Sequence, residues 1–219
     1  MIMVKLDIFA DPACPWCYVG KAYLDRALEK SGDHPFVVEW HPFVLNPDMP
    51  AEGMDRAVYL EIVFGSKEKA VEAHVELMDH AAKAGISFDF EKIKRSPNTL
   101  DAHRLVYWAG LESKQTPTMT ALMQAYWRDG RDISDHEVLC DVGDSVGLDA
   151  SVIARLLKTD SDIESIQRRD AHSREMGVKS VPTYIVAGQH AVPGAQNTEL
   201  WMNVISDIQK LLKEQPAQD

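Results

Sequence analysis

The chain has 219 residues, of which 45% are hydrophobic and 26% are charged, and 34 acidic against 23 basic side chains give a net charge of −11. This length and composition predict one globular domain with an insertion, or two small domains, with enough apolar residues for a proper core. The acidic balance argues against nucleic acid or an anionic membrane surface as a partner. No run of 18 uninterrupted apolar residues is present, so no membrane-spanning helix is expected.

The N-terminal segment predicts a strand rather than a targeting signal. MIMVKLDIFADPAC contains no basic run followed by a long apolar stretch, and no small-residue cleavage site. The three cysteines of the chain are too few for a framework of structural disulfides. We therefore expect a cytoplasmic protein.

The first 50 residues alternate between strand and helix patterns. Apolar and polar residues alternate from Val4 into Phe9, which predicts a strand that ends just before Asp11. A helical spacing of apolar residues follows the first two cysteines, with Gly32 as its stop. The β-branched and aromatic residues of Phe36–His41 then predict a second strand.

The middle of the chain, from about Ala51 to Gly177, follows a helical period almost throughout. Capping-box patterns predict the starts of two of its helices, Ser134 with Glu137 and Ser161 with Glu164. The segment therefore predicts several helices joined by short connections.

The strand pattern returns after residue 177. Thr183–Ala187 predicts a strand, Gly188 and Gln189 a tight turn, and His190–Val192 the partner strand. A final amphipathic helix runs through Leu200, Val204, Ile208 and Leu211.

The order of elements is thus βαβ, a helical insertion, then ββα, which is an α/β fold. We expect residues 1–50 and 178–219 to form one domain, and residues 51–177 to form a helical domain inserted into it.

The cysteine pair of CPWC lies where the first predicted strand meets its helix. Cys14 is expected near the N-cap and Pro15 near the first helical position, where the missing N–H of proline costs nothing. Free backbone N–H groups and the helix dipole favour a thiolate there, and can lower a thiol pKa from about 8.5 to about 3.5–7.5. Because Cys17 lies one turn further into the helix, we predict that Cys14 is the more exposed, nucleophilic thiol and Cys17 the resolving thiol.

Two other interpretations of the pair stay open. A zinc site would need two more ligands, and no second CxxC or His-x₃₋₅-His follows at a suitable distance. His74 and His80 are six residues apart and are expected on the surface of the helical block. The cysteines could instead be a reduced structural pair in the core. The position between strand and helix favours redox chemistry, so no metal is expected, and Cys140 is expected to be an inert structural thiol.

Taken together, the motifs resemble the thioredoxin superfamily in its DsbA-like branch. A strand, CPWC, a helix, a strand, a helical insertion, and SVPTYIV opening a hairpin before a last helix follow that order. CPWCYVGK, WHPFVLNP, NTLDAHRLVYWA, GRDISDHEVL and AVPGAQ are similar to FrnE-like proteins and span nearly the whole chain. The resemblance implies a thioredoxin fold with a large helical insertion domain. It also implies a redox-active Cys14–Cys17 disulfide in place of a bound cofactor, with glutathione as a candidate co-substrate.

The resemblance further implies a substrate site beside the cysteines. Pro182 is expected to be a cis-proline packed against the pair, and the backbone beside it, at Val181, to pair with the extended chain of a substrate. Trp16 is expected to be a partly exposed platform for that substrate. One position departs from many thioredoxin-like proteins, because Ile8 stands where they keep a buried carboxylate. Asp7, its neighbour, is expected to face the other way on an alternating strand.

Three functions are compatible with these patterns. The leading hypothesis is thiol–disulfide exchange with protein thiols or small thiols. The second is a glutathione-dependent isomerase or transferase of the 2-hydroxychromene-2-carboxylate isomerase or kappa type, whose members use serine at the position of Cys14. The third is a holdase that binds client proteins through an apolar face of the helical block. A monomer or homodimer is expected, without a nucleic-acid or membrane partner.

Overall fold

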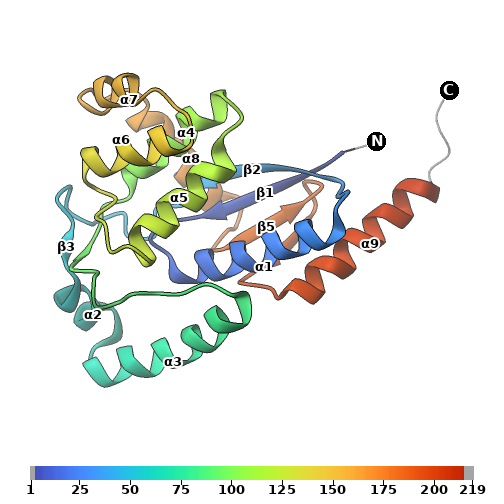
Figure 1. Cartoon of the computed structure of the whole chain (residues 1–219), viewed down its shortest axis with the longest axis horizontal. Coiled ribbons are helices and arrows are strands. Elements are labelled where there is room, and N and C mark those ends of the chain that lie inside the picture. Colours follow the sequence, from blue (N-terminus) through green and yellow to red (C-terminus); the bar gives the residue numbers. More distant parts are fainter. Residues whose placement is uncertain (1–2, 215–219) are drawn as a thin grey trace.

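A four-stranded mixed sheet lies at the centre of the computed structural model, which describes residues 3–214 (Figure 1). Its strands, in sheet order, are β2 (Phe36–Pro42), β1 (Val4–Ala10), β5 (Thr183–Val186) and β6 (His190–Pro193). β1 pairs in parallel with β2 and antiparallel with β5, and β5 pairs antiparallel with β6. This topology confirms the predicted thioredoxin fold.

The side chains of β1 alternate between two buried environments. Leu6, Ile8 and Ala10 belong to the main hydrophobic core, which they share with helices α1 (Pro15–Ser31) and α9 (Thr198–Glu214). These two helices pack against each other along one face of the sheet (Figure 1). Phe9 points to the opposite face and packs in a smaller cluster with Phe43 and Val178. Because β1 is buried on both faces, its C-terminal end holds the loop that follows it in a fixed place.

The segment between β2 and β5 is helical apart from one pair of short strands. Its elements are β3 (Met54–Asp55), α2 (Arg56–Phe64), α3 (Lys67–Ala84), β4 (Arg95–Ser96), α4 (Leu100–Leu111), α5 (Gln115–Trp127), α6 (His136–Ser145), α7 (Ala150–Leu157) and α8 (Ile163–Glu175). α3 and α5 contact α1, while α5 and α8 contact β2. Figure 1 shows α2 and α3 on one side of α1, and α4 to α8 grouped above the sheet. The inserted helices therefore contact both α1 and β2 of the β1–α1–β2 unit.

The two predicted capping boxes are wrong by one residue. Asp135 is the N-cap of α6, and its carboxylate accepts a hydrogen bond from the N–H of Glu137. Ser134 lies one residue before this N-cap, and its hydroxyl donates to the carboxylate of Asp132. Asp162 precedes α8 with a left-handed φ of 65°, and its carboxylate accepts from the indole of Trp108 instead of capping the helix.

The hairpin turn also falls one residue earlier than expected. β5 ends at Val186, and the residues with positive φ are Ala187 at 55° and Gly188 at 69°. Two successive positive φ values are the requirement of a type I′ hairpin turn. Gln189 therefore closes the turn, and its N–H donates to the carbonyl of Val186 at 3.1 Å.

Among the described residues, no helix has both the length and the apolar character needed to cross a bilayer.

Candidate active site

Cys14 stands at the N-terminus of α1, as the sequence predicts. It is the N-cap residue, with φ −87° and ψ 118°, and Pro15 occupies the first helical position. Its carbonyl accepts hydrogen bonds from the N–H groups of Cys17 and Tyr18, at 3.1 and 3.3 Å. The side chain of Cys14 makes no capping hydrogen bond. As part of the N-cap residue, its sulfur lies beside the helix N-terminus, where free backbone N–H groups favour a negative charge.

Both cysteines are buried free thiols. The exposed fraction is 4% for Cys14 and 1% for Cys17, so the predicted difference in exposure is small. Burial raises the pKa of Cys17 well above its ordinary value, and the neighbouring Cys14 raises it further. Cys17 is therefore held as a neutral thiol at neutral pH. A reaction that needs the Cys17 thiolate therefore requires a change in its burial or in its contact with Cys14.

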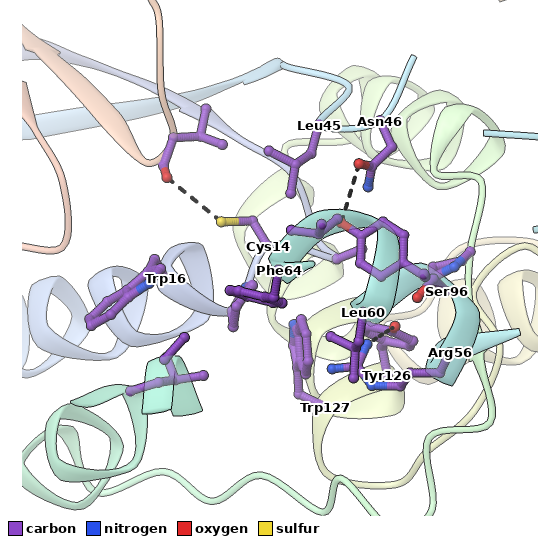
Figure 2. Close-up of a pocket in the computed structure, with 18 of the residues that line it drawn as sticks. Cys14, Trp16, Leu45, Asn46, Arg56, Leu60, Phe64, Ser96, Tyr126 and Trp127 are labelled. Carbon is purple, nitrogen blue, oxygen red and sulfur yellow. Dashed lines mark hydrogen bonds between the residues drawn. The ribbon is translucent and has the colours of Figure 1, made fainter. Parts of the chain in front are cut away.

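The loop before β5 closes over Cys14. The Val181–Pro182 peptide bond is cis, as the resemblance implies. The thiol of Cys14 donates to the carbonyl oxygen of Val181 at 3.6 Å, which Figure 2 marks with a dashed line. Two segments 167 residues apart in the chain thus meet at the sulfur.

Trp16 is half-buried and lines the space beside Cys14. Its ring makes an edge contact with His80, with ring centroids 5.3 Å apart. His80 in turn lies 3.2 Å from the hydroxyl of Tyr23. His74 stacks on Phe90 with centroids 4.5 Å apart, and both histidines are half-buried. The expectation that His74 and His80 lie on the surface therefore holds only in part, because aromatic side chains cover one side of each ring.

Asp11 is a site residue that sequence reasoning missed. Its carboxylate is fully buried and accepts hydrogen bonds from the N–H of Ala13 at 2.7 Å, the N–H of Leu45 at 2.8 Å and the hydroxyl of Thr99 at 2.8 Å. His103 is also buried, and its Nε2 lies 3.7 Å from Asp11 without a hydrogen-bond partner among the described residues. The sequence held one signal that could have pointed to Asp11, which is its position three residues before a cysteine at a helix start. Two of its three partners, Leu45 and Thr99, however, lie 34 and 88 residues further along the chain.

The neighbouring acid, Asp7, faces away from the cysteines, as predicted. Ile8 occupies the core side of β1. Asp7 accepts a hydrogen bond from His41 at 2.6 Å, and the ammonium group of Lys5 lies 2.8 Å from the carboxylates of both Asp7 and Glu39. Asp7, Glu39 and His41 are close enough to hold a metal ion. Lys5 forms ion pairs with both carboxylates, so these side chains belong to an ion-pair network.

A cavity of about 380 Å³ opens beside Cys14 (Figure 2). This volume lies within the usual range of about 300–1,000 Å³ for small-molecule sites. Its wall is mostly apolar and aromatic, with contributions from the cysteine loop, α2, α3, the end of α5 and the loop before Pro182. The side chain of Arg56 and the hydroxyl of Tyr59, which bonds to Asn46 at 3.2 Å, supply polar groups. The arrangement can hold a small or extended ligand next to the sulfur of Cys14.

Several known proteins are similar to this chain over nearly its whole length. The chain is 28% identical to the uncharacterized protein YwbO of Bacillus subtilis over 209 residues, which are 94% of this chain and 98% of YwbO. The structure matches a probable DsbA oxidoreductase from Streptomyces coelicolor with a TM-score of 0.83 at 24% identity, over 99% of this chain and 93% of that one. It matches the cytosolic disulfide reductase DsbM from Pseudomonas aeruginosa with a TM-score of 0.68 at 18% identity, over 94% and 99%.

The two structural matches show the fold. The family itself follows from the sequence profile described as a DSBA-like thioredoxin domain, which matches residues 5–206 and so includes the cysteine loop, the inserted helices and the cis-proline. The chain therefore belongs to the family of DSBA-like thioredoxin domains.

Proposed function

We propose that the protein is a thiol–disulfide oxidoreductase in which Cys14 is the nucleophile and Cys17 the resolving thiol. The observation that carries this proposal is the position of the Cys14 sulfur, at the N-terminus of α1 and 3.6 Å from the carbonyl of Val181. Cys17 lies one helical turn behind it. Family membership supports the reaction class, since proteins of this kind exchange disulfides.

The reaction proceeds in two exchanges. The Cys14 thiolate attacks one sulfur of a substrate disulfide, the S–S bond breaks, and the other substrate sulfur leaves as a thiolate that takes a proton from solvent. Cys17 then loses its proton and attacks the Cys14 sulfur of the mixed disulfide, releasing the second substrate thiol. The protein ends with a Cys14–Cys17 disulfide, and the substrate has gained two electrons. The reverse sequence oxidises a substrate dithiol.

The order of these steps follows from the two thiol environments. The raised pKa of Cys17 keeps it from reacting while Cys14 is free. Once Cys14 is part of a mixed disulfide, it no longer donates to the carbonyl of Val181. That carbonyl then becomes available to the backbone of a substrate, as in strand addition. Val181 and Pro182 therefore form the substrate-binding backbone of the proposal, and Trp16 the aromatic platform beside it.

Protein disulfides and small thiols are both candidate substrates. DsbM, which shares the fold, has been solved with glutathione. Glutathione as a co-substrate here is a proposal supported by that likeness, as is a cytoplasmic location. A chain with a thiol at both positions suits exchange better than a glutathione-dependent isomerase, because Cys17 would compete with a bound thiol cofactor.

Trapping the mixed disulfide tests the proposal. In a Cys140→Ser background, Cys17→Ser treated with oxidised glutathione is expected to accumulate one glutathione on Cys14, seen by mass spectrometry. The unsubstituted pair should lose the adduct and form the internal disulfide. Cys14→Ser is the control and should gain no adduct. A stable adduct on the intact pair, or labelling of Cys17 in the control at the same rate, would contradict the assigned roles.

A further inference from the structure

The cavity beside Cys14 has a charge opposite to that of the whole chain. The protein carries a net charge of −11 with 34 acidic residues, yet no aspartate or glutamate among residues 3–214 lines this cavity. The charged side chains that do line it are Arg56, on its inner wall, and Lys179, in the exposed loop that leads to Val181. A cavity with this charge is suited to an anionic ligand.

Arg56 is buried without an acidic partner. Its exposed fraction is 8%, and it forms no salt bridge with any acidic side chain in residues 3–214. The guanidinium donates to the hydroxyl of Tyr126 at 3.1 Å and lies 5.4 Å from the ring centre of Trp127. An arginine has five N–H donors, and a buried cation is normally paired with an anion. Figure 2 shows the side chain at the end of the cavity away from Trp16.

The helix that carries Arg56 gives no reason for a cation there. Arg56 is the first residue of α2, where the positive end of the helix dipole disfavours positive charge. His74, which also lines the cavity, has a lowered pKa because of burial and of the nearby Arg56. It therefore adds no second positive charge beside the arginine, and it offers no negative charge to pair with the guanidinium. The hydroxyl of Tyr126 is already engaged as a donor to the carbonyl of Arg95.

The walls between the arginine and the sulfur are aromatic or aliphatic. Tyr59, Leu60, Phe64 and Trp127 line the space that Cys14 shares with Arg56. Tyr59 lies near enough to both that its pKa, raised chiefly by burial, also responds to the charges of Arg56 and Cys14. A ligand that fills this space would have an apolar body, a charged end at Arg56 and a reacting end at Cys14.

We propose that the cavity binds low-molecular-weight disulfides or thiols with an aromatic or apolar body and a carboxylate, and that Arg56 holds the carboxylate while the ligand sulfur meets Cys14. This inference rests on the proposed exchange reaction and names its substrate class. The Cys14 thiolate attacks the ligand disulfide, and the departing half leaves as a thiolate. Cys17 then displaces the bound half as a second thiol, and the protein keeps the disulfide. Planar guanidinium and planar carboxylate form two parallel hydrogen bonds, which fixes the ligand's orientation.

Two aryl disulfides test this directly. DTNB has a carboxylate on each ring, whereas dithiodipyridine has no charge. In the Cys140→Ser protein, Arg56→Met is expected to lower the rate constant of Cys14 with DTNB about tenfold or more, as for the loss of one charge-assisted contact. The rate constant with dithiodipyridine should change little. Arg56→Lys should retain part of the preference, and Arg128→Met, which removes an exposed arginine outside the cavity, should behave as the parent.

A second measurement uses the protein without substitution at Arg56, in case that variant does not fold. Benzoate should slow the alkylation of Cys14 by iodoacetamide, and benzamide should not. Equal protection by both, or by neither, overturns the inference. So does an equal effect of Arg56→Met on the two disulfides. In those cases the exchange reaction still stands, because Cys14 reacts. If Cys14 reacts with neither disulfide, the proposed function itself fails.

Discussion

The two thiols of the CPWC loop differ in what surrounds them. Cys14 has a helix N-terminus beside it and a backbone carbonyl as its acceptor, whereas Cys17 is enclosed by the core and by Cys14. Burial is the largest cause of the raised pKa of Cys17. A neutral thiol is a poor nucleophile, so the raised pKa of Cys17 fits the resolving role proposed for it.

We predict that alkylation distinguishes the two thiols in the reduced, folded Cys140→Ser protein. Iodoacetamide should modify Cys14 at neutral pH and leave Cys17 unmodified until the pH rises above the ordinary thiol value of 9.0. Cys17 should stay slow to react in Cys14→Ser, because burial remains. Mass spectrometry after a time course gives the rates, and the same protein in urea is the control. Rapid alkylation of Cys17 in the folded protein at neutral pH would contradict this account.

The same raised pKa has a consequence for stability. The folded state favours the protonated Cys17 thiol, so this contribution to the free energy of unfolding is complete below pH 9.0 and is lost as the pH rises further. The reduced protein should therefore lose stability in alkali. The oxidised protein has no Cys17 thiol to ionise and should not show this part of the loss.

Asp11 is predicted to be the residue that fixes the cysteine loop in place. Asp11→Ala removes the acceptor of two partly buried backbone N–H groups and one buried hydroxyl. The expected cost is about 3 kcal/mol or more, since each hydrogen bond to a charged group contributes about 1.5–3 kcal/mol. Urea denaturation measures it. Asp79→Ala, which removes an exposed partner of Lys83, is the control and should leave stability unchanged. Equal stability of the two variants would show that Asp11 has no such role.

For individual residues of the site, the sequence predicted those that share a local motif and missed those that are joined by distant contacts. Cys14, Pro15 and Cys17 were placed correctly because a strand, a proline and a helix start determine their positions. Asp11 and Arg56 could not be assigned in that way. Two partners of Asp11 lie 34 and 88 residues further along the chain. The role of Arg56 depends on the cavity around it, which several distant segments form together.

Helix α1 has a second contact with the site besides its N-terminus. A Cβ atom at Gly20 would lie 2.5 Å from the Tyr184 hydroxyl and 3.0 Å from Cγ of Pro182. Real Cβ contacts are longer than this, so only glycine lets α1 approach the cis-proline loop so closely. The distance between Cys14 and the Val181 carbonyl therefore depends on this helix face as well as on the loop.

Gly20→Ala is predicted to push α1 and the cis-proline loop apart. Overpacking of this kind costs about 1–3 kcal/mol, and urea denaturation of the reduced protein should show that loss. The rate of Cys14 alkylation should also change, because its contact with Val181 is disturbed. Glu29→Ala, on the exposed face of the same helix, is the matched control and should alter neither. If Gly20→Ala matches this control, the close approach is not a constraint.

Over the whole molecule, the inserted helices and the central sheet share one hydrophobic core. The indole of Trp127, at the end of α5, donates to the carbonyl of Pro12 in the cysteine loop at 3.0 Å. The order of strands and helices was predictable because each has its own periodicity in the sequence. The packing of α3 against α1, which brings His80 beside Trp16, was not, because it depends on contacts between segments far apart in the chain.

The reduction potential of the Cys14–Cys17 pair tests the central claim most directly. The Cys140→Ser protein would be equilibrated in glutathione buffers of increasing oxidising power, and its free thiols counted. The account predicts a reversible two-electron couple between about −120 and −270 mV, the span of known oxidoreductases of this kind. A pair that never forms a disulfide across that span would contradict the exchange mechanism.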